Sequence, residues 1–519
     1  MKKILIFFLL MSCSRFVKMT DETFYEEIET NNSKTIHLVF SHNINGETHP
    51  CGCRQFPLGG FEQAYGHIMS LKKVAPLIYV DTGDTFFETT KIPNFILKSS
   101  RYKAKKIAEA LDMLDLKLMT PGDQDFALGE SFLKEIAQKH DFKFLITNAS
   151  KKLQLPHQKF FHLKVGKKNF FFLGVLRPDL LNHELRSLFV SPKTALKKQL
   201  ESLKNKYGHL KNKSFILLSH SGLDYDKNLA KLFPTFDWII GSHSQSFMRF
   251  SYDVGQTKLV QVLSRNHYLG EINLLSKKED AYHLVEMRDE VKNKIQPNPM
   301  TPWLQNYKKE YDKINLAQQA TDMAMTNEAK TIPTYISCSD CHDKQVEFWQ
   351  STAHSLALST LLNANEMNNP QCIKCHSVGF RKEGGFAATQ KFFKSENDFD
   401  TQKYLKEFKK AVKINHPVRK LSSSQRTQMA KDWLKFDKDH GITANYGNVQ
   451  CLNCHNQTAD HPFEIQPESK DQFKNKCLNC HTADQSPKWY DKDSNGLATS
   501  LNEKYFAKKL KEVSCPKIE

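Results

Sequence analysis

Short hydrophobic runs recur along the first half of the chain and alternate with stretches of helical character. Six of these runs are rich in β-branched or aromatic residues and end in polar ones: IHLVF (36–40), LIYVDTGD (77–84), FLITNA (144–149), FFFLGVL (170–176), SFILLSHSG (214–222) and DWIIGSH (237–243). This pattern predicts buried strands of an α/β protein. Because such folds place active sites at the C-terminal ends of their strands, the polar residues that close the runs are candidate site residues.

The pattern changes after residue 296. The sequence PNPM closes the alternating region, and the stretch that follows it has helical character and no cysteine. We predict a domain over 35–296, a linker helix within 297–330, and a mostly helical, loop-rich domain over 331–519. With 519 residues, the chain is long enough for two or three domains with proper cores.

Eight of the twelve cysteines fall in four CxxCH units in the second domain. The units are Cys338, Cys341 and His342; Cys372, Cys375 and His376; Cys451, Cys454 and His455; and Cys477, Cys480 and His481. A CxxCH unit is typical of c-type haem attachment, in which the two thiols bond to the porphyrin and the histidine binds iron. A zinc ribbon also has paired CxxC, but without the following histidine. Four units, each with its histidine, predict four c-type haems rather than zinc sites or redox disulfides.

Four further histidines follow residue 330 outside these units: His354, His416, His440 and His461. They are the candidates for the sixth iron ligands, opposite the four histidines of the motifs. Bis-histidine ligation would give low-potential irons that are suited to passing electrons. In the alternative, one or two of these histidines lie on the surface and one iron keeps an open position.

Three segments of this region carry a family resemblance: YISCSDCHDKQVEFWQSTAHSLAL (335–358), NNPQCIKCHSVGF (368–380) and NVQCLNCHNQTADH (448–461). They resemble the tetrahaem cytochrome c554 family over about residues 331–490, although Asn456 stands where that family often has glycine. The resemblance implies closely packed haems that exchange electrons. A region of this size around four porphyrins is expected to have little core of its own.

The front domain resembles a second family. An ordered series of segments carries the likeness: FSHNING (40–46), DTGD (81–84), TPGDQDFALG (120–129), LSHSGLDYDKNLAKLFPTFDWIIGSHSQ (218–245) and VQVLSRNHYLGEINL (260–274). They resemble the 5′-nucleotidase-type, calcineurin-like metallophosphoesterases. The resemblance implies an α/β four-layer sandwich with two metal ions, which activate water and clamp a phosphate.

The resemblance carries metal-ligand roles to seven residues of this chain: Asp84, Asp123, His220, His243, Gln245, Asn43 and Asn45. Asp84 matches the bridging carboxylate, and with Asp123, His220 and His243 it would hold one divalent ion such as zinc or manganese. A second ion would have Asp84, Gln245 and two amides, and an amide oxygen is a poor ligand for zinc. Gln124 replaces the histidine that contacts the phosphate, which argues against ordinary phosphoester hydrolysis.

A thiol pair follows the altered metal loop in the sequence HPCGCRQFPLGG. Cys51 and Cys53 are candidates for replacement metal ligands or for an easily reduced disulfide. In the alternative, the pair is inert or one member is bridged to Cys515.

The first residues, MKKILIFFLLMSCS, have two lysines and a short apolar run, typical of a secretory signal. The run resembles a bacterial lipobox, so we expect a signal peptide over 1–12, a lipid anchor at Cys13 and a tether over 13–34. A plain secretory signal with a chance cysteine is the alternative. The expected location is that of an exported bacterial lipoprotein, on the periplasmic face of a membrane or at the cell surface.

The formal net charge is +17, but the lysines are spread along the chain without a basic block. We therefore expect no nucleic-acid partner, and relate the charge to solubility and to attraction toward an acidic partner or surface.

Together these features predict a membrane-anchored electron carrier that serves redox partner proteins, with a degenerate phosphoesterase-like domain that binds a metal, an oxyanion or a partner. Three alternatives remain open. The chain is a metal-dependent hydrolase, a haem- or thiol-based oxidoreductase for a small nitrogen or sulfur compound, or a scaffold. The sequence assigns no catalytic residue.

Overall fold

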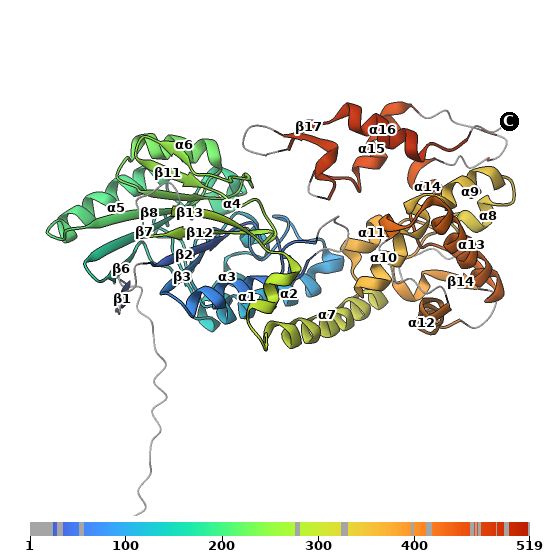
Figure 1. The fold of residues 1–519 in the computed structure, drawn as a ribbon, viewed down its shortest axis with the longest axis horizontal. Coiled ribbons are helices and arrows are strands. Elements are labelled where there is room, and N and C mark those ends of the chain that lie inside the picture. Colours follow the sequence, from blue (N-terminus) through green and yellow to red (C-terminus); the bar gives the residue numbers. More distant parts are fainter. Residues whose placement is uncertain are drawn as a thin grey trace, which may run out of the picture.

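The structure is a computed structural model with two lobes (Figure 1). One lobe is the α/β front domain, and the other is built from the helices of the second half of the chain. Helix α7 (Met300–Asp322) runs between them and falls inside the predicted linker. The residues that the structure describes are 24–28, 35–50, 57–275, 281–322, 331–395, 399–411, 418–456, 461, 464, 469–483, 485–492 and 498–516.

The front domain contains two sheets. In spatial order the first has seven strands: β1 (Phe24–Ile28), β6 (Phe161–Val165), β7 (Lys168–Leu176), β8 (Lys213–His220), β9 (Trp238–Gly241), β11 (Thr257–Val260) and β10 (Tyr252–Val254). The second has six: β13 (Tyr282–Glu286), β12 (Tyr268–Asn273), β2 (His37–Ser41), β3 (Leu77–Asp81), β4 (Leu116–Met119) and β5 (Lys143–Phe144). Strands β7, β8 and β9 are parallel, as are β2, β3 and β4. Their C-terminal ends therefore meet at one edge of each sheet.

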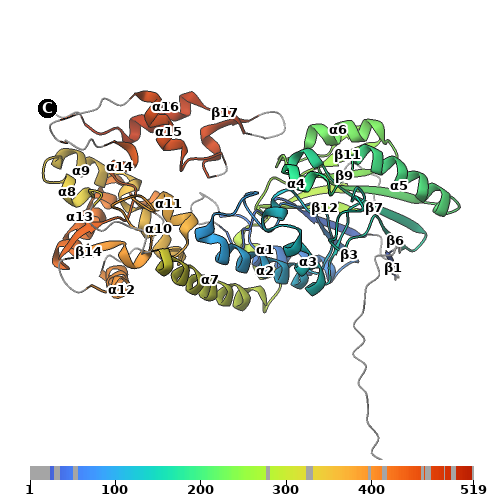
Figure 2. The ribbon, with the colours of Figure 1, turned by 180° about the vertical axis from the view of Figure 1, so that it is seen from behind.

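Side-chain alternation along the strands explains the layers. Phe40 and Val80 face the core between the two sheets, while their neighbours Val39 and Tyr79 face the helices on the outer side. Seen from behind, α1, α2 and α3 cover the six-stranded sheet and α5 and α6 cover the other (Figure 2). The front-domain helices are α1 (Phe61–Lys72), α2 (Leu97–Met113), α3 (Glu130–Lys139), α4 (His183–Arg186), α5 (Pro192–Tyr207) and α6 (Leu223–Leu232). The predicted α/β four-layer sandwich is confirmed.

Two local expectations differ from the structure. The run at 144–149 is not a full strand, because only the two residues of β5 pair with β4 before the chain turns. The expected tether at 13–34 contains β1, which adds a parallel edge strand to β6.

The second half is mostly helical, as predicted. Its helices are α8 (Tyr335–Cys338), α9 (Asp343–Gln350), α10 (Ala357–Ala364), α11 (Pro370–His376), α12 (Thr401–Ala411), α13 (Ser423–Asp439), α14 (Cys451–Cys454), α15 (Lys470–Leu478) and α16 (Glu503–Val513). Two short hairpins accompany them: β14 (Phe393–Ser395) with β15 (Ile442–Asn445), and β16 (Tyr490–Lys492) with β17 (Ala498–Leu501).

The expectation that this half has little core of its own is wrong for residues 356–446. An apolar cluster there contains Trp433, Tyr404 and Tyr446, which are among the largest fully buried side chains of the chain. The rest of the lobe differs, because Phe506 is the one buried apolar side chain among the described residues of 451–516. In the described part of the chain, no helix has the length and apolarity that crossing a membrane requires.

Candidate functional site

The eight motif cysteines and the four motif histidines line one cavity of about 2020 Å³. Helices α8, α11, α14 and α15 carry or abut the motifs. Positions i and i+3 lie on the same face of a helix, so the two thiols of a CxxC point the same way. The backbone thus turns all four pairs toward a shared space.

The motifs approach one another in two pairs. The thiols of Cys338 and Cys451 lie close enough to perturb each other's ionisation, and so do those of Cys375 and Cys480. The first motif therefore adjoins the third, and the second adjoins the fourth. All nine cysteines among the described residues are free thiols rather than disulfides, as covalent attachment to porphyrin requires.

Two motif histidines have ring orientations that suit iron. His376 Nδ1 donates to Ala357 O at 2.6 Å, and His481 Nδ1 lies 2.8 Å from Ser486 Oγ. Such hydrogen bonds fix the ring and make Nε2 the metal-binding nitrogen. Burial lowers the pKa of both, that of His481 to about 4. Both rings are therefore neutral, which is the form that binds a metal.

The structure separates the four candidates for the sixth ligand. His354 and His461 line the cavity. The rings of His461 and His342 are 6.0 Å apart, and those of His354 and His481 are 6.4 Å apart. A metal-bound imidazole nitrogen lies about 2 Å from the metal, so two imidazoles on opposite sides of one ion have ring centres roughly 6 Å apart. Both pairs match this spacing.

His440 does not join them. It follows α13 directly, its Nδ1 donates to Phe436 O at 2.8 Å, and its ring packs on Phe436 and Tyr404. The end of α13 places His440 beside the apolar cluster, and it is not among the residues that line the cavity. His416 lies outside the residues that the structure describes.

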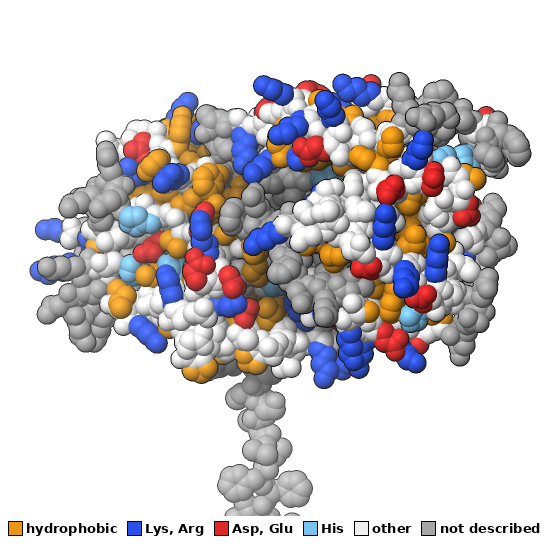
Figure 3. All heavy atoms as spheres, turned by 45° about the vertical axis from the view of Figure 1, so that its right-hand side comes forward, with side chains coloured by type: hydrophobic (Ala, Val, Ile, Leu, Met, Phe, Trp, Pro, Cys, Tyr) orange, Lys and Arg blue, Asp and Glu red, His pale blue; other side chains and the backbone are white. Residues whose placement is uncertain are grey.

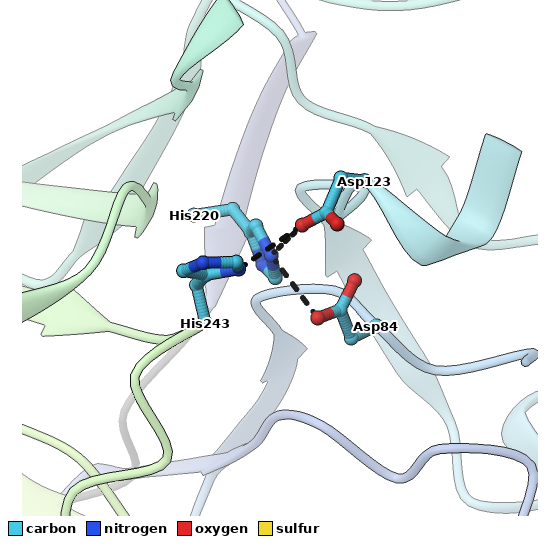
Figure 4. Close-up of side chains that lie close together, drawn as sticks. All are labelled: Asp84, Asp123, His220 and His243. Atoms are coloured by element: carbon cyan, nitrogen blue, oxygen red, sulfur yellow. Dashed lines mark hydrogen bonds and ion pairs between the residues drawn. The ribbon is translucent and has the colours of Figure 1, made fainter. Parts of the chain in front are cut away.

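A second site lies at the strand ends of the front domain (Figure 4). Asp84 and Asp123 follow β3 and β4, His220 ends β8, and His243 follows β9. His220 Nε2 is 3.3 Å from Asp84 Oδ2 and 3.1 Å from Asp123 Oδ1, and His243 Nδ1 is 3.1 Å from that same oxygen. One ligand atom from each of the four residues lies within 4.8 Å of the others. Two carboxylates and two imidazoles suit zinc, manganese or iron.

The electrostatics of this cluster favour a cation. Burial alone would raise the pKa of Asp123, but hydrogen bonds with His220 and His243 outweigh it and hold the pKa below its usual range. Burial alone would lower the pKa of His220, yet the neighbouring charge of Asp84 and the bond to Asp123 raise it well above its usual value. His220 Nδ1 also donates to Thr82 O at 2.7 Å, which directs Nε2 at the two carboxylates.

The predicted second metal position is taken by protein hydrogen bonds. Asn43 Nδ2 donates to Asp84 Oδ2 at 2.9 Å, and Asn43 Oδ1 accepts from the backbone N–H of His243 at 3.1 Å. Asn45 and Gln245 lie in the same two loops, partly or fully buried. The four residues Asp84, Asp123, His220 and His243 fit one ion, and in this arrangement both ends of the Asn43 amide are engaged by protein groups.

Backbone strain is concentrated in these loops. Five of the seven predicted metal residues have φ between 48° and 69°: Asn43, Asn45, Asp84, His243 and Gln245. For a residue with a side chain this left-handed region costs about 1–3 kcal/mol, and such strain gathers at functional sites. The loops are therefore held in place by their neighbours rather than by local preference.

Two of those neighbours were missed in the sequence. Asp125 accepts backbone N–H bonds from Asp84, Thr85, Phe86 and Gly122, and so shapes the Asp84 loop. His42 holds Asn43: its Nδ1 faces Asn43 Oδ1 at 2.9 Å, its Nε2 accepts from Val262 N at 2.8 Å, and burial lowers its pKa to about 3. The available signal was position, since each lies within two residues of a predicted ligand.

Three predicted thiols, Cys13, Cys51 and Cys53, lie outside the described residues. Cys515 is exposed and lines the rim of the cavity.

Comparison with known proteins agrees with both halves. The family model "Cytochrome c554 and c-prime" matches residues 337–400. Mouse 5′-nucleotidase is 24% identical over 202 residues, which are 37% of this chain and 33% of that protein. The chain thus spans about one third of the length of the curated relatives it matches. A cytochrome c554-type segment therefore follows a 5′-nucleotidase-like domain, and c-type haem is the group that the cytochrome segment implies.

Two solved structures resemble the front part more distantly. A 5′-nucleotidase precursor of Thermus thermophilus is 18% identical and aligns with a TM-score of 0.43 over 55% of this chain and 60% of its own. The sulfate thiohydrolase SoxB of Thermus thermophilus is 15% identical, with a TM-score of 0.44 over 54% of this chain and 61% of its own.

Proposed function

We propose that this chain is an exported, lipid-anchored electron-transfer protein that carries four c-type haems and holds one divalent metal ion in its front domain. The observation that carries the proposal is the shared cavity, which all four CxxCH motifs line. Bound haem supplies an iron that takes up and releases one electron. The lipobox-like residues ending at Cys13 support the anchor and the exported location.

The protein's own residues do three things in this proposal. The thiol pairs would hold the porphyrins, the motif histidines would be iron ligands, and His354 and His461 would supply two further iron ligands. Contact of the first motif with the third and of the second with the fourth supports short electron-transfer steps. The proposal is tested by haem staining and iron analysis of the exported protein, where four irons per chain are expected and three or fewer would refute it.

Replacing a sixth ligand should leave one haem iron with an open coordination position. In His354→Ala or His461→Ala, one haem of the chain is expected to change from low spin to high spin, because the second imidazole is lost. Optical and EPR spectra of the oxidised protein measure the change. His440→Ala is the matched control and should leave the spectra unaltered, since His440 packs outside the cavity. A spectrum of His461→Ala identical to that of the wild type would mean that another group holds that position.

The outer face of α16 is the docking site that we propose for an acidic redox partner. Lys504, Lys508 and Lys511 are exposed at positions i, i+4 and i+7, which is one stripe of the helix. The two acidic residues of α16, Glu503 and Glu512, pair with Lys474 and Lys509 instead. The inner face of α16 carries Phe506 and Leu510, which line the haem cavity. Lysine and arginine side chains gather along this edge in Figure 3. One helix, about 10 Å thick, separates a docked partner from the cavity.

Reversing this charge should slow electron exchange. The triple variant K504E/K508E/K511E is expected to reduce the rate constant with a small acidic electron-transfer protein at least about ten-fold at low salt. Stopped-flow absorbance measures it. The matched control K193E/K197E/K204E inverts three exposed lysines of α5 in the front domain and should have a much smaller effect. Equal slowing by both variants would indicate a response to net charge and no docking face.

Metal-dependent hydrolysis is the second candidate function. The gathered cluster of Asp84, Asp123, His220 and His243 favours it. The amide of Asn43 at the second metal position opposes it, because two-metal catalysis needs both ions.

A further inference from the structure

The haem cavity extends beyond the second half of the chain. Part of the cavity wall is formed by residues of the front domain: Gly46, Glu47, Thr48, His49, Glu88, Lys103 and Arg265. Gln371, which precedes Cys372, is fixed to this wall. Its Nε2 donates to Glu88 Oε2 at 2.9 Å, and its Oε1 accepts from Lys103 Nζ at 3.3 Å. The residue that precedes the second CxxCH motif therefore contacts the front domain directly.

The loop that contains Asn43 also contributes Gly46 to this cavity wall. Asn43, at the metal centre, and Gly46, at the cavity, are three residues apart and hence at most about 10 Å. Gly46 N donates to Thr85 O at 3.0 Å, one residue after Asp84. A single loop thus separates the two sites.

A continuous hydrogen-bonded chain joins them. From the metal side, Asn43 donates to Asp84 and its backbone carbonyl accepts from Arg265 N at 2.7 Å. The Arg265 guanidinium then donates to Glu47 Oε2 at 2.7 Å and to Glu88 Oε1 at 2.9 Å. Glu88 in turn holds Gln371 beside the second motif.

Gln124 makes a second, shorter connection. Its backbone N–H donates to Asp84 Oδ1 at 2.9 Å. With its amide oriented to suit its neighbours, its side-chain nitrogen lies 2.9 Å from Glu88 O. Gln124 stands where the resemblance expects the phosphate-contacting histidine. The glutamine at this position instead connects Asp84 at the metal centre with Glu88 in the cavity wall.

We propose a further function: the front domain is a divalent-cation sensor, and binding of the ion at Asp84, Asp123, His220 and His243 raises the electron affinity of the haem on the second CxxCH motif through the Arg265–Glu88–Gln371 chain. The inference rests on the proposed haem attachment and metal site. Added positive charge favours the reduced, less positive iron. At a fixed potential the ratio of reduced to oxidised haem is expected to change about five-fold or more when the ion binds, which is the lower end of the coupling usual between linked sites.

Coupling of this kind is reciprocal, which gives two independent measurements. The first is a redox titration of the full haem-loaded chain with and without Mn²⁺, in which one step of the titration is expected to move in favour of reduction. The second is calorimetric Mn²⁺ binding to the oxidised and the reduced chain, in which the reduced chain binds more tightly by the same factor.

A variant separates the connecting chain from the metal site. Arg265→Gln removes both guanidinium bonds but no metal ligand, so Mn²⁺ still binds the oxidised chain while the redox shift shrinks by half or more. Arg249→Gln, at an exposed arginine of the same domain, is the matched control and keeps the full shift.

The outcomes are distinct. Four haems and bound Mn²⁺ without any redox shift overturn this inference and leave the proposed function standing. Unequal factors in the two measurements also overturn it. A chain with fewer haems, or one that binds no Mn²⁺, refutes the proposed function and the coupling together.

Discussion

Protein made without covalent haem is expected to keep its front domain and the apolar cluster of residues 356–446, but to lose the ordered structure of residues 451–516. In that last segment Phe506 is the one buried apolar side chain among the described residues. Burying one phenylalanine contributes about 1.5–3 kcal/mol. Ordering a chain costs about 1–2 kcal/mol for each residue. The segment cannot order itself, so it depends on the apolar faces of the haems.

Hydrogen exchange with mass spectrometry measures this loss. Peptides from 451–516 should exchange within seconds in haem-free protein and slowly in the holoprotein, while peptides from strands such as β8 stay protected in both. The Cys515→Ala holoprotein is the matched control. It lacks one cysteine outside the CxxCH motifs, so it should retain all haems and the full protection of the wild-type holoprotein. Unchanged protection of 451–516 without haem would show that the protein alone orders this segment.

Asp123→Asn is expected to weaken divalent-metal binding by at least about 100-fold, because it replaces a charged ligand by a neutral amide of the same shape. Asp123 contacts both histidines of the cluster, so no other carboxylate takes over its position. Titration calorimetry with Mn²⁺ or Zn²⁺ measures the affinity. If the front domain hydrolyses phosphoesters, metal-dependent turnover should fall along with the affinity. Asp224→Asn is the control, since that carboxylate on α6 is almost fully exposed and should not matter.

The same site predicts a pH dependence with a definite sign. The metal competes with a proton on His220, whose pKa the neighbouring carboxylates raise well above 6.5. Affinity should therefore fall as pH decreases, by up to about ten-fold per pH unit below that pKa. In Asp123→Asn the pKa of His220 should fall, because one of the two carboxylates that raise it is removed. The residual affinity should therefore depend less on pH. Wild-type binding that strengthens on acidification would contradict the assignment of His220 as a ligand.

Two residues of the front domain that depart from the metallophosphoesterase pattern make structural hydrogen bonds in this protein. Asn43 and Gln124 are losses when the domain is compared with a two-metal hydrolase. In the folded protein both make hydrogen bonds that stabilise one site and connect it to the haem cavity. Asn43 and Gln124 therefore contribute hydrogen bonds that position the loops of the site.

Much of this protein follows from its sequence alone. The short apolar runs predicted most of the buried strands, because a strand covered on both faces needs apolar side chains at consecutive positions. The CxxCH spacing identified the thiols and histidines that line the shared cavity, because two thiols three residues apart and the adjacent histidine are placed by the local backbone. The resemblance to the metallophosphoesterases named the four residues that gather at the candidate metal centre, and the ends of parallel strands bring them to one edge.

Other features were decided by the tertiary structure. Whether a histidine can reach an iron depends on where its helix ends: His354 and His461 line the cavity, while the end of α13 turns His440 into an apolar cluster. The core at 356–446 arises from contacts between segments far apart in the chain. Closure of the haem cavity by the front domain depends on side chains such as Gln371 and Glu88, 283 positions apart, which no local pattern relates. Local sequence specifies chemistry and element type, whereas distances between chemical groups are set by packing of the whole chain.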